Sequence, residues 1–475
     1  MIIHHYWRAT FVVNALEWAA DNKSILRTLT LACICLLAFA IRLYSIVRFE
    51  SVIHEFDPWF NYRATQQLVE KGWDEFIHWF DDKAWYPLGR DVGGSVFPGL
   101  MVTSALAHGL LNKVMGFPID VREVCVFLGP VVSMLTVLST YHLTVELKNG
   151  AAGLLAAFIM AICPGYIARS VGGSYDNEAI SIFLMTFTFL MWIRASKTGS
   201  AVYATVTAMS YYYMVASWGG YAYIINLIPL HVFALLCMNR YSHKLYVSYS
   251  TFYVLGTVAS MTVPFVNTAP IRTSEHVGAF GVFGLVQLFA FSSVVRESVA
   301  GAGFRMLMKL LIGSVAILGA GAVAVMSTAG LIAPWAGRFQ SLWDPNHAKE
   351  HAPLIASVAE HQPTTWSAFF VDFNWLIYML PIGIYYCLRR NGSEHVFGVL
   401  YGLTASYFAA VMVRLELTLA PMVSVAAGLA VTWILDQLMG DNEPAASKDE
   451  PVAPEAKTAA ATASSGPNQR GDRKS

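Results

Sequence analysis

Long apolar runs, separated by short polar segments, account for most of the chain. A helix needs about 20 mostly apolar residues to cross a membrane, and twelve runs approach this length. We expect these runs to form transmembrane helices near residues 25–47, 121–143, 151–168, 179–195, 200–216, 221–238, 245–265, 277–295, 310–333, 368–388, 395–413 and 417–438. The pattern therefore predicts an all-α polytopic membrane protein with about twelve transmembrane helices in residues 1–439.

A further apolar run, residues 96–111, contains Pro98, Gly99 and Gly109. Because a run this short with helix breakers spans a bilayer poorly, we interpret it as an interfacial or re-entrant helix. With this run left out and a cytosolic N-terminus, every short cytosolic loop is basic, as the positive-inside rule requires. The basic residues are Lys148, Arg194, Lys197, Arg240, Lys244, Arg296, Arg305, Lys309, Arg389 and Arg390.

This topology places three long or polar segments together on the non-cytosolic side of the membrane. They are residues 48–120, 169–178 and 334–367. Residues 440–475 are rich in Ala, Pro, Ser, Glu and Lys and have almost no large apolar side chains. Such a composition cannot bury enough surface to offset the entropy of ordering, so we expect a disordered cytosolic tail.

Composition supports the membrane assignment and excludes several other classes of protein. Hydrophobic residues make up 56% of the chain and charged residues only 13%, whereas a soluble domain has about 25% charged residues. The formal net charge is zero, so we do not expect nucleic acid as a partner. The six cysteines have no metal-binding or disulfide spacing.

Acidic residues are sparse near the predicted spans, and four of them lie in the three non-cytosolic segments. Asp57 lies in the motif HEFDPWFNYR, Asp176 and Glu178 lie in GSYDNEAI, and Glu360 lies in SVAEHQP. Because hard divalent cations prefer oxygen ligands, four carboxylates on one face could form a cation site. The alternative is that each acid only caps a helix or forms a turn, since carboxylates are favoured at helix N-termini.

Two arginines complete the candidate chemistry. Arg414 lies between two predicted spans, where a charge is costly and usually faces a cavity or a partner. A planar guanidinium at this depth suits a phosphate group, but a snorkelling side chain or a local pair with Glu416 explains it equally well. Arg169, seven residues before Asp176, is a weaker candidate of the same kind.

These motifs resemble those of the catalytic subunit of oligosaccharyltransferase, over roughly residues 25–435. Glu55-Phe56-Asp57 and Asp176-Asn177-Glu178 are similar to the two acidic motifs of the family. The segment from Ser357 to Glu360, followed by His361, is similar to its SVSE motif, with alanine in place of the second serine. The resemblance implies a GT-C type fold, in which Asp57, Asp176 and Glu178 bind Mg²⁺ or Mn²⁺. It also assigns Asp57 and Glu360 to orienting the acceptor amide, Arg414 to the lipid diphosphate, and Arg169 to activity.

The resemblance further implies a function in protein N-glycosylation at the lumenal face of the endoplasmic reticulum membrane. The expected partners are a lipid-linked oligosaccharide donor, an acceptor polypeptide containing Asn-x-Ser/Thr, and other oligosaccharyltransferase subunits. The family's WWDYG motif does not occur in the chain, so we expect the chain to correspond to the membrane half of the family. Two alternatives stay open: a non-catalytic membrane scaffold or paralogue, and a glycosyltransferase that uses a polyprenyl monophosphate.

Overall fold

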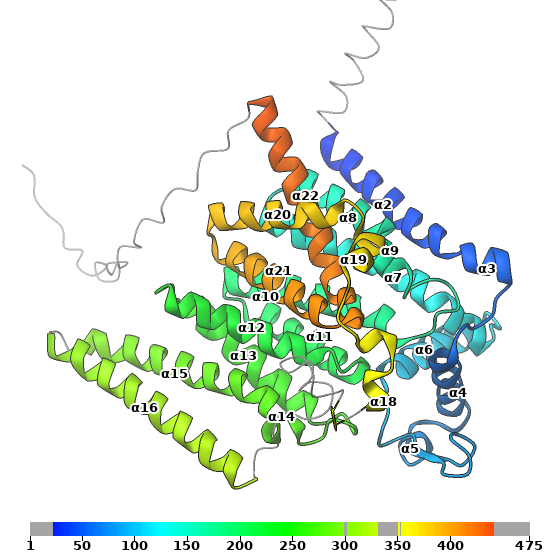
Figure 1. The fold of residues 1–475 in the computed structure, drawn as a ribbon, viewed down its shortest axis with the longest axis horizontal. Coiled ribbons are helices and arrows are strands. Elements are labelled where there is room, and N and C mark those ends of the chain that lie inside the picture. Colours follow the sequence, from blue (N-terminus) through cyan, green and yellow to red (C-terminus); the bar gives the residue numbers. More distant parts are fainter. Residues whose placement is uncertain (1–21, 299–301, 331–349, 352, 441–475) are drawn as a thin grey trace, which may run out of the picture.

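The computed structural model describes residues 22–298, 302–330, 350–351 and 353–440, and it is almost wholly helical (Figure 1). Helices lie at each of the predicted spans. They are α2 (Lys23–Arg42) with α3 (Tyr44–Phe49), α7 (Val121–Leu147), α8 (Gly150–Ile162), α10 (Asn177–Thr198), α11 (Ala201–Ser217), α12 (Tyr221–Cys237), α13 (His243–Ser260), α15 (Val277–Ser298), α16 (Ala302–Thr328), α19 (Trp366–Phe373) with α20 (Leu376–Arg390), α21 (Ser393–Val411) and α22 (Glu416–Met439).

Shorter elements connect these helices. They are α4 (Phe56–Lys71), α5 (Trp73–Ile77), α6 (Gly99–Gly109), the π-helical turn η1 (Leu110–Val114), α9 (Pro164–Ile167), α14 (Ala269–Arg272), α18 (Pro353–Ala356), and the 3₁₀ turns η2 (Ser274–His276), η4 (Ala359–His361) and η5 (Val413–Leu415). Two short antiparallel strands, β1 (Phe80–Asp81) and β2 (Arg90–Asp91), pair Phe80 with Asp91 and Asp81 with Arg90.

Each predicted run contains a helix, but the count of twelve spans is not confirmed. Within the described residues, five helices are long and apolar enough to cross a membrane, or six if the bent pair of α19 and α20 is one span. The five are 23–49, 121–147, 177–198, 274–295 and 413–439. Among the remaining helices, α8 and α12 are apolar but have only 13 and 17 residues, fewer than a full span requires. The chain is therefore an all-α protein with several membrane-capable helices.

Two predicted spans are broken, and each break has a local cause. The run 151–168 ends as helix α8 at Ile162, because Cys163 is extended before Pro164, and the residue before a proline disfavours the helical conformation. The run 368–388 divides into α19 and α20, which meet at an angle of 86°. At this bend Asn374 has a φ of 51° and a ψ of −136°, a backbone conformation that ends α19.

Helix α6 forms within the short apolar run 96–111. It has 11 residues, so it rises only about 16 Å, roughly half the thickness of the hydrocarbon core. It begins directly after Pro98 and packs against α4 and α7. Its placement at the membrane interface stays a prediction. The predicted tail, residues 440–475, lies outside the described residues except for Gly440, as do residues 334–349 of the third polar segment.

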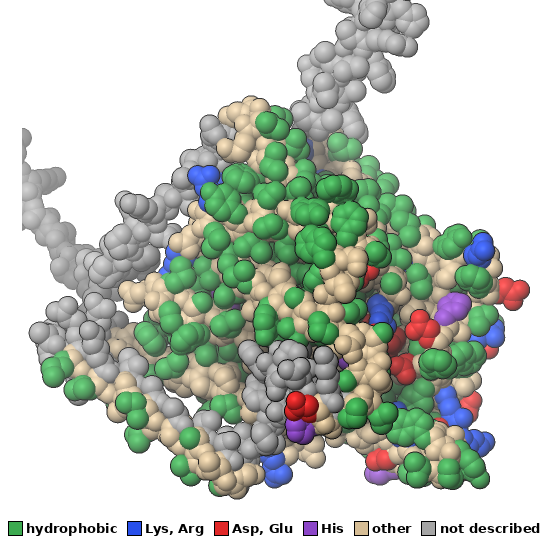
Figure 2. All heavy atoms as spheres, in the orientation of Figure 1, with side chains coloured by type: hydrophobic (Ala, Val, Ile, Leu, Met, Phe, Trp, Pro, Cys, Tyr) green, Lys and Arg blue, Asp and Glu red, His purple; other side chains and the backbone are tan. Residues whose placement is uncertain are grey.

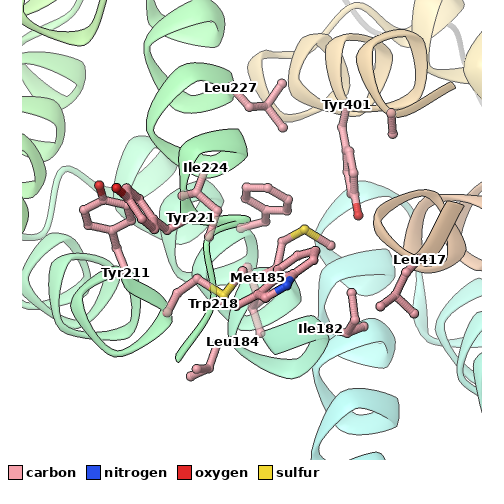
Figure 3. Packing of buried hydrophobic residues seen from close by; sticks show 14 of the residues in the cluster. Ile182, Leu184, Met185, Tyr211, Trp218, Tyr221, Ile224, Leu227, Tyr401 and Leu417 are labelled. Atoms are coloured by element: carbon pink, nitrogen blue, oxygen red, sulfur yellow. The ribbon is translucent and has the colours of Figure 1, made fainter. Parts of the chain in front are cut away.

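Helix α10 lies at the centre of the bundle, in contact with α7, α11 and α13. Figure 3 shows Ile182, Leu184 and Met185 of this helix packed among side chains from neighbouring elements. Hydrogen bonds between helices add to this packing, as is usual in membrane proteins. Trp192 donates from Nε1 to Nδ1 of His231 on α12 at 3.1 Å. The surrounding helices therefore hold α10 firmly, and its N-terminus carries two of the candidate acids.

Candidate functional site

The candidate residues lie at the N-terminus of α10 and on the segments packed around it. Asp176 is the N-cap of α10, and its carboxylate accepts a hydrogen bond from the backbone N–H of Asn177 at 2.7 Å. Asp57 lies in the first turn of α4. Both acids thus occupy the helix-start positions expected of simple caps. Figure 2 shows charged side chains gathered on the side of the molecule that carries α4, α5 and α6, while the rest of this face is largely hydrophobic.

Two arginines and two glutamates from distant parts of the chain form a closed ring of ion pairs, which we call the arginine–glutamate ring. It consists of Arg169, Glu178, Glu360 and Arg414. Arg169 lies 3.3 Å from Glu178 and 2.6 Å from Glu360, measured between nitrogen and oxygen. Arg414 lies 3.0 Å from Glu178 and 3.9 Å from Glu360. Each guanidinium group therefore bridges both carboxylates, as its planar fork allows.

Glu178 is the buried member of the ring. Its side chain is 1% exposed, whereas those of Arg169, Arg414 and Glu360 are 29%, 26% and 38% exposed. Both carboxylate oxygens of Glu178 are buried without a hydrogen bond of good geometry. The two arginines therefore hold Glu178 mainly by charge, and its oxygens could still accept a better-placed ligand.

Backbone hydrogen bonds bring Glu360 and Arg414 together. The N–H of Val413 donates to the carbonyl of Gln362 at 3.1 Å, and the N–H of Thr364 donates to the carbonyl of Ala410 at 3.1 Å. These bonds join the segment after η4 to the segment around η5. Arg169 and Arg414 also outweigh the effect of partial burial on Glu360 and lower the pKa of its carboxyl group below the ordinary value.

Gly173 joins the first and second polar segments. The N–H of His54 donates to its carbonyl at 3.0 Å, and its own N–H donates to the carbonyl of Val126 at 3.2 Å. Its φ is +90°, and a Cβ atom here would lie 2.2 Å from the carbonyl oxygen of Val52. Only glycine fits this close crossing without strain, and the crossing places α4 beside the start of α10.

The electrostatic surroundings of Asp176 leave its carboxylate only partly compensated. Burial is the main cause that raises the pKa of Asp176 above its ordinary value, and the charge of Asp57 raises it further. The hydrogen bond from Asn177 and the charge of Arg414 oppose this rise without cancelling it. Asp176 therefore lacks full compensation for its negative charge.

The donor chemistry of the site fits a divalent cation. Asp57, Asp176 and Glu178 offer the carboxylate oxygens that hard cations prefer, and the Glu178 oxygens are buried without hydrogen bonds. Across the ranges that the structure describes, however, no three His, Cys, Asp or Glu side chains are gathered closely enough to hold a metal ion. The predicted three-carboxylate set therefore fits the cation in charge and donor type, while Glu178 is paired with the two arginines.

The other predicted residues lie at the edge of this site. Glu55 is exposed at the N-cap of α4, and its side chain forms no capping hydrogen bond. Ser357 donates locally to the carbonyl of Leu354 at 2.7 Å. His361 ends η4, and its charge helps to lower the pKa of Glu360. The alternative local pair of Arg414 with Glu416 does not form in the described part of the chain. Glu416 is buried facing Asp372, while the ion pairs of Arg414 run to Glu178 and Glu360.

Sequence reasoning did not assign roles to three residues that shape the site. Arg42 is fully buried and donates from Nε to Oγ of Ser170 at 2.7 Å, directly beside Arg169. A charged residue at the end of an apolar run could have indicated this. Asn61 lies in the segment HEFDPWFNYR and Tyr175 lies in GSYDNEAI. Their contacts depend on how α4 packs against the start of α10.

Comparisons with known proteins show which sequences and folds this chain resembles. Residues 25–427 match the family model described as "Oligosaccharyl transferase STT3, N-terminal". A curated relative, the dolichyl-diphosphooligosaccharide–protein glycosyltransferase subunit stt3 of Schizosaccharomyces pombe, is 51% identical over 420 residues. That match covers 88% of this chain and 56% of the relative, so the chain spans little more than half of the relative's length.

Solved structures show the same fold at low sequence identity. The oligosaccharyltransferase AglB of Archaeoglobus fulgidus, in complex with an inhibitory peptide and a dolichol-phosphate, has a TM-score of 0.69 at 18% identity. The match covers 88% of this chain and 51% of that one. A crystal structure of the Archaeoglobus fulgidus oligosaccharyltransferase, in complex with Zn and sulfate, has a TM-score of 0.64 at 18% identity and covers 86% of this chain and 50% of that one. From the extent of the family match and the 51% identity, the chain belongs to the oligosaccharyl transferase STT3 family, whose N-terminal part it matches.

Proposed function

We propose that the chain forms the membrane part of an oligosaccharyltransferase catalytic subunit. This enzyme transfers an oligosaccharide from a dolichyl diphosphate carrier to the asparagine of Asn-x-Ser/Thr, at the lumenal face of the endoplasmic reticulum membrane. Its partners are the lipid-linked donor, the acceptor polypeptide and other subunits of the complex. Family membership supports the reaction, and the archaeal AglB of similar fold was solved in complex with an inhibitory peptide and a dolichol-phosphate.

The arginine–glutamate ring is the observation that carries the proposal. Arg414 and Arg169 place two guanidinium groups side by side at the N-terminus of α10. They face the carboxylates of Glu178 on α10 and Glu360 on η4. The diphosphate of a lipid-linked donor carries two negative charges, as the two glutamates do, and guanidinium groups bind phosphate oxygens in a bidentate manner. Arg414 would bind the donor diphosphate, with Arg169 beside it.

The acids have two roles in this mechanism. A carboxamide nitrogen is a poor nucleophile because its lone pair is delocalised. Asp57 and Glu360 would accept hydrogen bonds from the acceptor amide and hold it in a reactive orientation. Asp57, Asp176 and Glu178 would hold Mg²⁺ or Mn²⁺, which when bound supplies positive charge near the leaving diphosphate.

A donor-binding experiment tests this function and separates it from the alternatives. We expect the purified chain, with Mn²⁺ present, to bind a short-chain polyprenyl diphosphate more tightly than the matching monophosphate. Arg414→Ala should weaken diphosphate binding by at least about tenfold, which corresponds to about 1.4 kcal/mol. The matched control is Arg194→Ala, which removes an arginine from the other end of α10.

Each outcome discriminates between the candidate functions. Equal or tighter binding of the monophosphate would favour a monophosphate-dependent glycosyltransferase. Binding that is insensitive to Arg414→Ala would contradict the assigned diphosphate site. A non-catalytic scaffold should tolerate Asp57→Asn and Glu360→Gln when the chain is assayed in its assembled complex, whereas the proposed enzyme should lose glycan transfer.

A further inference from the structure

A buried network of polar side chains joins α4 and α6 to the two residues before α10. The hydroxyl of Tyr175 lies 2.8 Å from Oγ1 of Thr65 on α4 and donates to Oγ of Ser104 on α6 at 2.7 Å. Asn61 on α4 donates from Nδ2 to the carbonyl of Tyr175 at 3.2 Å and to Oδ1 of Asp176 at 3.5 Å. We call Asn61, Thr65, Ser104 and Tyr175 the tyrosine network.

The tyrosine network joins the same two elements, α4 and the start of α10, that carry the two aspartates of the candidate cation site. Asn61 follows Asp57 by four residues, so both side chains lie on one face of α4. Tyr175 immediately precedes Asp176 along the chain. A rotation or shift of α4 relative to α10 would therefore break the contacts of Asn61 and change the separation of Asp57 and Asp176 in the same movement.

Burial makes the tyrosine network specific for one arrangement. Thr65 and Ser104 are fully buried, and Tyr175 and Asn61 are nearly so. Buried polar groups need partners, because an unsatisfied one loses its hydrogen bonds to water without replacing them. A different position of α4 would take both acceptors from the Asn61 amide and would separate the Tyr175 hydroxyl from Thr65. Thr65 and Ser104 would keep their bonds to carbonyls of their own helices. Because the lost partners all lie between α4 and the start of α10, the network favours one position of α4.

We propose that Tyr175 and Asn61 are positioning residues for divalent cation binding by Asp57 and Asp176. Neither residue needs to touch the cation. Tyr175 fixes α4 and α6 against the start of α10, and Asn61 fixes the face of α4 that carries Asp57. This inference rests on the proposed function, because it requires the two aspartates to bind a cation.

The test compares two buried tyrosines that each lose only a hydroxyl group. Tyr175→Phe removes the centre of the tyrosine network. Tyr249→Phe is the matched control, because Tyr249 is fully buried on α13 and its hydroxyl donates to the carbonyl of Ala279 at 2.8 Å. The readout is the Kd for Mn²⁺ of the purified chain, from free-Mn²⁺ electron paramagnetic resonance, with the unfolding temperature measured on the same samples.

We expect Tyr175→Phe to weaken Mn²⁺ binding by about 10-fold or more, as is typical when residues that orient metal ligands are changed. Tyr249→Phe should lower the unfolding temperature to a similar degree and leave the Kd unchanged. Asn61→Ala is a second, independent variant and should weaken Mn²⁺ binding in the same direction. A merely structural role would lower stability without changing the Kd.

The outcomes separate this inference from the proposed function. If Asp176→Asn abolishes Mn²⁺ binding while Tyr175→Phe and Asn61→Ala bind as tightly as Tyr249→Phe, the positioning role is overturned and the cation site stands. If the unmodified chain binds no Mn²⁺, or if Asp57→Asn and Asp176→Asn leave binding unchanged, the cation site is wrong and the inference is overturned with it.

Discussion

The two ends of α10 both carry ion pairs, but the pairs differ in composition and burial. At the C-terminal end, Glu146 of α7 accepts hydrogen bonds from Arg194 at 2.9 Å and from Lys197 at 3.1 Å. At the N-terminal end, Glu178 is nearly inaccessible and lies between two arginines without good hydrogen-bond geometry. The helix dipole favours acids at the N-terminal end and bases at the C-terminal end. The charged residues of α10 are therefore well placed at both ends.

The difference supports the proposal that the N-terminal end of α10 binds a ligand. At the C-terminal end, one acid meets two bases, and its oxygens are satisfied. At the N-terminal end, four carboxylates (Asp57, Asp176, Glu178 and Glu360) meet two guanidinium groups, which leaves an excess of two negative charges when all are ionised. One divalent cation would balance that excess. At the C-terminal end the carboxylate oxygens have hydrogen-bond partners, whereas at the N-terminal end both oxygens of Glu178 lack them.

The largest difference between the two ends should follow neutralisation of the central acid. Glu178→Gln removes the carboxylate that two arginines share, and we expect it to cost about 2–3 kcal/mol of stability. This is below the usual 3–5 kcal/mol for a broken buried pair, because both arginines are partly exposed. Glu146→Gln, with a side chain 20% exposed, should cost less than about 1 kcal/mol. Thermal unfolding in detergent measures both, and equal losses would break the comparison.

A smaller difference should follow from replacing arginine by lysine. Arg169→Lys retains the charge but cannot bridge Glu178 and Glu360 with one planar fork. We expect a loss of about 1.5–2 kcal/mol, the lower part of the range for hydrogen bonds to charged groups. The matched variant Arg194→Lys, at a site where one nitrogen contacts one acid, should lose under about 0.5 kcal/mol. Chemical denaturation of both variants checks this, and a greater loss for Arg194→Lys would contradict it.

The pH at which the ion pairs of Glu360 are lost should follow from the pKa of its carboxyl group. Its pKa is lowered in the folded chain, so its contribution to stability is present above the ordinary glutamate pKa, about 4.3, and is lost as the pH falls through the lower folded value. The ion pairs of Glu360 with Arg169 and Arg414 should therefore persist in acid that would protonate an ordinary glutamate. Arg169→Gln should move the pKa of Glu360 upward.

Infrared titration of chains with isotope-labelled glutamate measures this pKa, with Glu360→Gln as the reference that identifies the signal. A carboxyl group at position 360 that titrates at or above the ordinary glutamate value would contradict the ring.

The smallest effect should come from Lys197, at the C-terminal end of α10. This side chain is 37% exposed, so its ion pair with Glu146 is screened by water and salt. Lys197→Ala should change stability by less than about 0.5 kcal/mol, a shift near the limit of thermal unfolding measurements. A loss above about 1 kcal/mol would show that the two ends of α10 are more alike than their burial indicates.

Much of the architecture was predictable from the order of residues. The apolar runs located every described helix longer than the polar helix α4, because an apolar surface of that length is stable only in a membrane or a core. The motifs around Asp57, Asp176 and Glu360, together with Arg169 and Arg414, identified the side chains that surround the start of α10. The breaks at Cys163 and Asn374 were missed, because a local turn leaves the hydrophobicity of a run almost unchanged.

Which acid meets which arginine was decided only by the tertiary structure. From sequence, Glu416 was as good a partner for Arg414 as any other acid, being two residues away. Instead, the hydrogen bonds between the segments around η4 and η5 and the packing of α10 bring Glu178 and Glu360 to Arg414 from distant parts of the sequence. Hydrophobic pattern and side-chain type are properties of the sequence itself. Charge pairing between segments this far apart depends on the helix packing that brings them within a few ångströms.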